Sequence, residues 1–229
     1  MKVFVIGGAG GVGRRLAQLL TTRGDEVSGM FRDPTQAERV TATGATPVLG
    51  DLIGDDVAEL ARRVAGHDAV VFSAGAHGTG VDKTTAIDGK GLEKTAAAAR
   101  QAGVRRFFLV SAFPEAGRDR ETSAGFEHYM RVKKSAEVHL TRTDLDWVIV
   151  RPGTLLDDAG TGRVTAGPAV EYGAVPRDDV AAFIGAALAE PALTRAIVEL
   201  TAGDTPVADA VAGLASSSPA VAPPARPVP

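Results

Sequence analysis

The sequence predicts an α/β fold, a doubly wound parallel sheet with helices on both faces. Short apolar runs alternate along the chain with longer stretches in which apolar residues recur at helical spacing. The length of 229 residues also suits one domain of this class. We therefore expect a single domain over residues 1–215 with small substrate-side elements near its C-terminal end. The Ser, Pro and Ala-rich residues 216–229 are expected to form a flexible tail.

Seven short apolar runs predict the strands. The first run is apolar at every position, as expected for a strand that is buried on both faces of a parallel sheet. The sixth run is stopped by Pro152, because proline has no N–H to give to a neighbouring strand. The predicted strands are 3–6, 26–31, 46–49, 69–72, 107–110, 147–150 and 197–200.

Seven stretches between these runs predict the helices. The first has leucines at helical spacing and ends before Gly24, a favourable residue after a helix. The second begins at Pro34, with Asp33 as its N-cap. The sixth carries Asp178 and Asp179 in its first turn, where the helix dipole favours carboxylates. The predicted helices are 11–23, 34–43, 55–64, 87–101, 126–141, 177–189 and 206–214.

Composition excludes several classes of function. The formal net charge of −3 offers no basic surface to nucleic acid. The sequence has no cysteine, which rules out thiolate catalysis, and its four histidines lack the spacing of metal ligands. No apolar run is long enough to span a membrane, and the first residues do not resemble a signal peptide. We expect a cytoplasmic protein whose partner is a small molecule; the oligomeric state cannot be predicted.

A glycine-rich turn follows the first predicted strand and opens the first predicted helix. Residues 7–13 read Gly-Gly-Ala-Gly-Gly-Val-Gly. Glycine permits a tight turn and a close approach of the backbone to a pyrophosphate, and the helix N-terminus favours the anion. We therefore expect a Rossmann-type site for a dinucleotide, formed by Gly7, Gly10, Gly11, Val12 and Gly13.

The residues after the second strand separate NADP from NAD. Arg32 can bind a 2′-phosphate with several donors, which favours NADP(H), while NAD(H) remains possible. Asp33 can instead accept a hydrogen bond from a ribose hydroxyl, but a role as helix N-cap is the stronger interpretation.

Four further stretches, together with this turn and Arg32, carry a family resemblance. They are Gly50-Asp51-Leu52, residues 102–107 (AGVRRF), residues 150–153 (VRPG) and residues 175–181 (VPRDDVA). With them the chain resembles the atypical short-chain dehydrogenase/reductases, in the branch called NAD(P)H-binding or NmrA-like. The resemblance covers nearly all of residues 1–214. It specifies the superfamily and no particular substrate.

The resemblance implies further contacts with the cofactor. Asp51 and Leu52 would border the adenine, although Asp51 as a loop cap is an equal alternative. Three residues after the fourth strand would pass the ribose and pyrophosphate: Ser73, Ala74 and Gly75. Pro152 and Gly153 would contact the nicotinamide face, or else simply end the sixth strand.

Tyr129 and Lys133 are four residues apart on a predicted helix and therefore share one face. This is the Tyr-x-x-x-Lys spacing of the short-chain dehydrogenases that the chain resembles. A phenol can give the proton that an alkoxide needs after hydride transfer, and a nearby ammonium favours the phenolate. The resemblance adds Ser111 as a donor that orients the substrate, and gives Lys133 the role of ribose clamp.

These residues predict an NADP(H)-dependent oxidoreductase of the short-chain dehydrogenase/reductase type, acting on a small carbonyl or alcohol. Loops 75–85, 112–125 and 153–176 should surround the substrate, with His77, Phe113 and Leu155 as candidate lining residues. The alternatives are a sugar-type epimerase or dehydratase, a flavin or biliverdin-type reductase, and a non-catalytic redox sensor that binds NADP(H).

Overall fold

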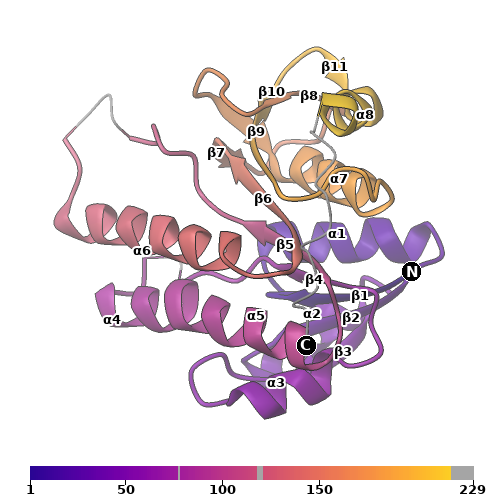
Figure 1. Ribbon diagram of the computed structural model, residues 1–229, viewed down its shortest axis with the longest axis vertical. Helices are drawn as coiled ribbons and strands as arrows, with labels where there is room; N and C mark the ends of the chain where they lie inside the picture. The colour runs from indigo at the N-terminus through magenta and orange to yellow at the C-terminus, as the bar shows by residue number, and fades with distance from the viewer. Residues whose placement is uncertain (77, 118–120, 218–229) are drawn as a thin grey trace, which may run out of the picture.

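The computed structural model describes residues 1–76, 78–117 and 121–217. Within these residues nine strands form one sheet in the order β11-β8-β10-β6-β5-β4-β1-β2-β3 (Figure 1). Neighbouring strands from β3 to β10 run parallel, which confirms the predicted α/β class. The strands of this sheet are β1 (Lys2–Ile6), β2 (Glu26–Phe31), β3 (Thr46–Leu49), β4 (Ala69–Phe72), β5 (Arg106–Val110), β6 (Asp146–Pro152), β8 (Arg163–Gly167), β10 (Ala196–Ala202) and β11 (Thr205–Pro206).

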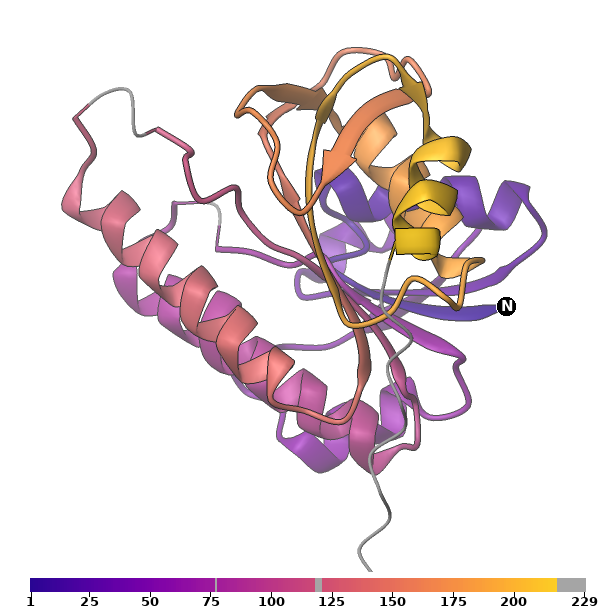
Figure 2. The ribbon, with the colours of Figure 1, turned by 45° about the horizontal axis from the view of Figure 1, so that its top comes forward.

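Helices cover both faces of the sheet, as expected for a doubly wound fold (Figures 1 and 2). Buried side chains place α1, α2, α7 and α8 on one face and α3, α5 and α6 on the other. The helices are α1 (Gly11–Thr22), η1 (Pro34–Gln36), α2 (Ala37–Thr41), α3 (Val57–Val64), α4 (Val81–Thr84), η2 (Thr85–Gly91), α5 (Leu92–Gln101), α6 (Ala124–Thr141), α7 (Arg177–Leu188) and α8 (Val207–Ser217).

The core follows from the two-residue period of the strands. In β1, Val3 and Val5 belong to one buried cluster, and Phe4 and Ile6 belong to the cluster on the opposite face. All four side chains are at most 1% exposed. A continuously apolar sequence is therefore needed to bury both faces of this central strand.

Every predicted strand lies within an observed one, but four short strands were not predicted. β8 pairs antiparallel with β10, and β11 pairs antiparallel with β8, so one edge of the sheet departs from the predicted parallel arrangement. A small second sheet joins β7 (Thr154–Leu156) to β9 (Ala174–Pro176). These strands are only two to five residues long, which leaves little apolar signal in the sequence.

Two helices differ most from the predicted boundaries. The helix predicted at 87–101 begins earlier, at α4, and passes through the π-helical segment η2 before α5. The missed residues before Ile87 include Val81, Asp82, Thr84 and Thr85, which have low helix propensity and weaken the helical pattern. The last helix, α8, reaches Ser217, so the first two residues of the predicted tail are helical; its remainder, 218–229, lies outside the described residues.

The strand order predicts a ligand site at the carboxyl ends of the central strands. The chain builds outward from β1 to β3 and then returns to β4 on the other side of β1. In open α/β sheets, ligands bind at the carboxyl ends of the strands where the order switches in this way.

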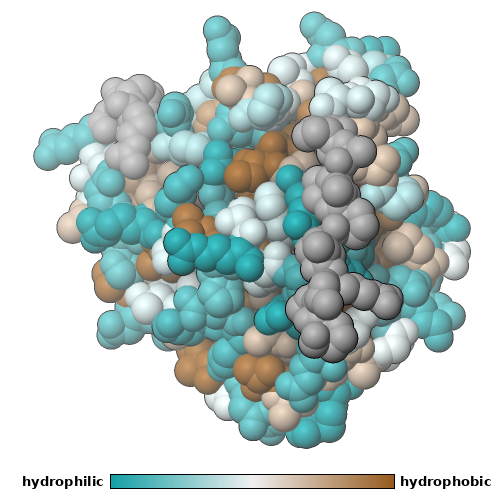
Figure 3. Space-filling view, viewed as in Figure 1, coloured by the Kyte–Doolittle hydropathy of each residue, from teal (hydrophilic) through white to brown (hydrophobic). Residues whose placement is uncertain are grey.

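Figure 3 shows hydrophobic residues on the viewed face only as small groups among hydrophilic ones. No described helix combines the length and apolar character required to cross a membrane.

Candidate functional site

Two adjoining cavities lie at the carboxyl ends of β1, β2, β4 and β5. The first, of about 460 Å³, lies beside β2 and β3, and the second, of about 540 Å³, lies beside β5 and α6. Both are lined by Gly11 and by Ser73, Ala74 and Gly75. Together they form a continuous place for an elongated ligand that extends from β3 to α6.

The glycine-rich turn forms the wall between the cavities and the first helix. Gly7 has a positive φ of 82°, and the N–H groups of Gly7 and Gly8 both donate to Met30 O, at 3.1 and 2.9 Å. A Cβ on Gly8 would lie 2.8 Å from Gly29 Cα, and one on Gly13 would collide with Gly7 O. The backbone therefore packs in a way that side chains would prevent.

The start of α1 is open to an anion. Gly10, its N-cap, has no side chain to occupy the free N–H groups, and the first turn contains no acidic residue. Gly10 and Gly11 line the first cavity, and Gly11 and Val12 line the second. Free N–H groups and the helix dipole at this position suit a phosphate, so the turn fits the pyrophosphate of a dinucleotide.

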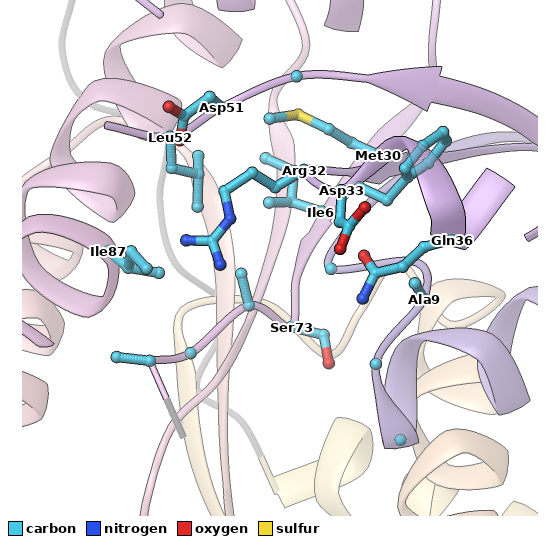
Figure 4. Close-up of a pocket in the computed structure, with 18 of the residues that line it drawn as sticks. Ile6, Ala9, Met30, Arg32, Asp33, Gln36, Asp51, Leu52, Ser73 and Ile87 are labelled. Carbon is cyan, nitrogen blue, oxygen red and sulfur yellow. The ribbon is translucent and has the colours of Figure 1, made fainter. Parts of the chain in front are cut away.

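Arg32 lies at the end of β2 and lines the first cavity. In Figure 4 its guanidinium reaches across the cavity towards Leu52 and Ile87, away from Asp33 and Gln36. Asp33 accepts hydrogen bonds from Thr35 N at 3.0 Å and Thr35 Oγ1 at 2.8 Å. The hydrogen bond from Thr35 N, above all, lowers the pKa of Asp33, which acts as the predicted N-cap.

Asp51 and Leu52, which the resemblance assigns to the adenine, both line the first cavity. Asp51 also caps its own loop, because its side chain accepts from Ile53 N at 3.0 Å. Pro152 and Gly153 are buried and line neither cavity. Gly153 packs so closely against Gly173 O that a Cβ would collide with it. The predicted nicotinamide contact of these two residues therefore gains no support from the geometry.

Helix α6 brings Tyr129 and Lys133 to the second cavity, where Ser111 at the end of β5 also lies. Lys133 Nζ lies 5.9 Å from the centroid of the Tyr129 ring. It donates to Val110 O at 3.0 Å, and the Lys133 side chain is only 7% exposed. The three residues that the sequence assigned to catalysis thus share one cavity.

Asp88 was not predicted from the sequence. It lies in the π-helical segment η2 and its side chain is fully buried. Asp88 Oδ1 is 3.4 Å from Lys133 Nζ, and Oδ2 accepts from Ala76 N at 2.9 Å. Burial of a lysine charge requires such a partner. Asp88 therefore fixes the ammonium of Lys133 beside Tyr129.

A second buried ionic group lies behind Ser111. Glu137 follows Lys133 by one helical turn on α6 and accepts hydrogen bonds from Arg151, which also pairs with Glu199 on β10. The side chains of Glu137, Arg151 and Glu199 are at most 10% exposed. Hydrogen bonds to Glu137 raise the pKa of the Arg151 guanidinium. The spacing of Tyr129, Lys133 and Glu137 was the available signal for this group, but their partners depend on tertiary contacts.

Arg177, at the start of α7, is a further residue that sequence reasoning did not assign to the site. Its Cδ and Nε lie so close to Gly11 that a Cβ there would be 2.7 Å from each. Arg177 Nη1 donates to Leu155 O at 3.2 Å and pairs with Asp157 at 3.1 Å. The Arg177 side chain therefore packs against the glycine-rich turn at the wall of the second cavity.

The predicted substrate loops contribute unequally. Leu155 lines the second cavity, together with Gly78, Gly80 and Val81 of the first loop. Ser123 and Gly125 also line it. Phe113 is instead buried against Tyr172, with ring centroids 5.3 Å apart. His77 lies outside the described residues.

Comparisons with known proteins identify the family and the fold. A family model described as NAD(P)H-binding matches residues 7–191. An uncharacterised sugar epimerase from Bacillus subtilis is 39% identical over 213 residues, which cover 92% of this chain and 99% of that protein. A Bacillus halodurans structure assigned as a NAD-dependent epimerase/dehydratase has a TM-score of 0.85 and 35% identity, covering 93% and 100% of the two chains. An anaerobilin reductase from Escherichia coli O157:H7 has a TM-score of 0.72 and 26% identity, covering 89% and 98%.

Proposed function

This chain belongs to the NAD(P)H-binding family, and from that premise we propose that it is an NADP(H)-dependent oxidoreductase acting on a small carbonyl or alcohol. The observation that carries the proposal is the second cavity, where Ser111, Tyr129 and Lys133 lie beside the glycine-rich turn. A protein that only stored or sensed the cofactor would not need an acid/base pair there. The substrate would bind between α6 and the loops that contain Val81 and Leu155.

The residues that would hold the cofactor follow from the two cavities. Gly10, Gly11 and Val12 would bind the pyrophosphate at the start of α1, with Arg177 contributing a positive charge from the other side. Arg32 would bind the 2′-phosphate of NADP(H), for which a guanidinium offers several donors. Adenine would lie by Asp51 and Leu52, and Ser73, Ala74 and Gly75 would follow the chain of the cofactor towards Lys133.

When bound, the nicotinamide would supply or accept the hydride. Tyr129 would move the accompanying proton, donating from its hydroxyl to the substrate oxygen in reduction and accepting in oxidation. Lys133, held in place by Asp88 and Val110 O, would stabilise the phenolate left behind and clamp the ribose. A positioned acid/base of this kind contributes about 10² to 10⁴-fold to a rate.

The direct test is NADPH oxidation with a panel of ketones, quinones and flavins. We expect turnover with at least one member, and Tyr129→Phe should lower kcat by about 100-fold or more while NADPH affinity stays unchanged. Tyr172→Phe is the matched control, because it removes the hydroxyl of the other tyrosine, which bonds to Thr154 at 2.6 Å. Equal activity of Tyr129→Phe and the wild type would reject Tyr129 as the acid/base.

Epimerisation is the second candidate, because two of the similar proteins are assigned as epimerases. The same acid/base pair would act on a hydroxyl group of a sugar, and the cofactor would end in the oxidation state in which it began. Only residues 153–217 follow the first six parallel strands among the described residues, which leaves a small surface for a nucleotide sugar. Conversion of one sugar epimer to the other without net NADPH consumption would favour this candidate.

A further inference from the structure

The hydroxyl proton of Ser111 is directed away from the second cavity. Ser111 Oγ lies 2.7 Å from Glu137 Oε1, and both residues are buried. An ionised carboxylate can only accept hydrogen bonds, so the serine must be the donor in this contact. Ser111 lines the second cavity, and its Oγ can therefore only accept a hydrogen bond from a ligand there.

Two hydrogen bonds from Arg151 join Glu137 to a guanidinium. Arg151 Nε donates to Glu137 Oε1 at 3.0 Å, and Arg151 Nη2 donates to Oε2 at 2.7 Å. This paired geometry, with one guanidinium nitrogen on each oxygen, is the one that a carboxylate forms with arginine. Both carboxyl oxygens of Glu137 therefore act as acceptors.

The far side of Arg151 is also anchored. Arg151 Nη1 lies 3.4 Å from Glu199 Oε1, and Glu199 Oε2 accepts from Val170 N at 3.0 Å. The group is therefore held from β5, α6, β6 and β10 together. If Ser111 turned its proton towards the cavity, a buried carboxylate would lose a donor, which costs more than an ordinary exposed hydrogen bond.

A second hydroxyl group in the cavity, that of Thr84, also donates its proton to the protein. Thr84 Oγ1 donates to Gly80 O at 3.0 Å, and Thr84 lines the second cavity. Its lone pairs, like those of Ser111, remain available to a ligand. The hydroxyl groups at these two positions therefore present acceptors, whereas a plain carbonyl oxygen needs donors.

We propose that Ser111 accepts a hydrogen bond from a substrate hydroxyl, so that the second cavity selects hydroxylated substrates, such as a diol or its hydroxy ketone. This inference rests on the proposed function only in taking the second cavity as the substrate site. It changes the role expected for Ser111 from donor to acceptor. Glu137 is the positioning residue: it accepts the Ser111 proton and so leaves Ser111 Oγ as an acceptor, without touching the substrate.

The test measures binding in complexes where no hydride can pass. Cyclohexane-1,2-diol is titrated into the NADPH complex and cyclohexane-1,2-dione into the NADP⁺ complex, with ligand-detected NMR as the readout. We expect Ser111→Ala to weaken the diol by about three- to tenfold, the usual range for one hydrogen bond, and to change the dione by less than about twofold. Ser28→Ala is the matched control, since Ser28 Oγ bonds to His67 Nε2 instead, outside both cavities.

The outcomes separate this inference from the proposed function. Absence of NADPH binding in a first titration would overturn both. With NADPH bound, a diol that fails to bind the wild type, an equal loss of diol and dione, or a loss of the dione alone would overturn the role of Ser111. Thermal unfolding checks that each variant folds; if Ser111→Ala does not, Ser111→Cys replaces it, because a thiol sulfur is a weak acceptor.

Discussion

One face of α6 carries three residues with different surroundings. Tyr129 is partly exposed to the cavity, Lys133 is paired with Asp88, and Glu137 is paired with Arg151. Two of these are buried charges, each of which must recover the free energy of hydration that it loses. The structure supplies this through ion pairs with residues on other elements. The charges of Lys133 and Glu137 therefore depend on Asp88 and Arg151, which lie on other elements.

The pair of Asp88 and Lys133 gives a prediction for stability. Asp88→Asn keeps the shape of the side chain but leaves the buried ammonium of Lys133 without its counter-charge. We expect the free energy of unfolding to fall by about 3 kcal/mol, as for other broken buried pairs. Urea denaturation measures it as a lower midpoint with an unchanged slope. Asp82→Asn on α4 is the matched control, because Asp82 is exposed; equal stability of both variants would contradict a structural role for the pair.

Asp144 gives a prediction for pH. The hydrogen bond from Arg100 Nε, 2.6 Å from Asp144 Oδ1, lowers the pKa of this carboxyl below its ordinary value. Its stabilising contribution is therefore present above the unfolded pKa of about 4, and is lost as the pH falls through the lower, folded value.

Asp144→Asn should accordingly flatten the acid side of the stability profile, measured as thermal midpoints below about pH 4. The effect should be small and weaken with added salt, because Asp144 and Arg100 are both about half exposed. Asp204→Asn, at an exposed carboxylate near β11, serves as the control. Identical profiles for Asp144→Asn and the wild type would count against the contribution of this pair.

The sequence indicated the residues that face the cavities better than it indicated their partners. Glycine spacing and the interval from Tyr129 to Lys133 are local patterns, and the structure brings these residues to adjoining cavities. Asp88, Glu137 and Arg177 act through contacts with residues far along the chain. Such contacts leave no local pattern, so the sequence could not assign them.

At the level of elements, burial decided what could be predicted. Strands buried on both faces, such as β4, have an apolar residue at each position and were found with accurate bounds. β9 and β11 have two or three residues, and they pair only because neighbouring strands are in place. The start of the α4–α5 helix, before Ile87, was missed for a related reason. Its Val81, Thr84 and Thr85 have low helix propensity, and packing of α4 and η2 against α6 compensates.

The glycine-rich turn gives a prediction for one element. Gly13→Ala would drive a Cβ into Gly7 O, so the turn and the start of α1 must separate. We expect a loss of about 1–3 kcal/mol in stability from overpacking, and a marked loss of NADPH affinity, since the N–H groups would no longer converge. Calorimetric titration and urea denaturation measure the two effects.

Gly213→Ala in α8 is the matched control for this substitution. A Cβ at Gly213 meets no atom within 4 Å, so the same change there should stabilise the helix by up to about 1 kcal/mol. If Gly13→Ala bound NADPH as tightly as Gly213→Ala, the close approach of Gly13 to Gly7 would not be needed for the site.

On the scale of the whole molecule, the first and last parts of the chain meet around the cavities. Helices α1 and α7 pack together, and Arg15 on α1 pairs with Asp178 at 2.7 Å and with Asp157 at 3.3 Å. The predicted doubly wound topology accounts for this meeting, because it brings α1 and α7 to the same face. The antiparallel edge of β8 and β11 could not be foreseen, since no pattern in the sequence fixes the direction of such short strands.

Cofactor binding should stabilise the whole fold. A ligand at 100 times its dissociation constant adds about 2.7 kcal/mol, which corresponds to a rise in melting temperature of about 5–10 °C for a chain of this size. We expect NADPH to raise the melting temperature more than NADH does at equal concentration, because Arg32 would meet the 2′-phosphate. Arg32→Met should remove this difference, whereas Arg62→Met, at an exposed position on α3, should keep it. An unchanged preference in Arg32→Met would reject the role of Arg32.

The shape of the second cavity depends on the number of residues in the π-helical segment. A π-helical turn contains more residues than an α-helical turn, so deleting one residue from Thr85–Gly91 would allow regular α-helical bonding. The preceding helix α4 would then rotate by about 100° relative to α5. Val81 and Thr84 would leave the cavity wall although neither had been substituted. Relatives that differ here by a single insertion or deletion should therefore diverge in substrate range even when all their cavity side chains are identical.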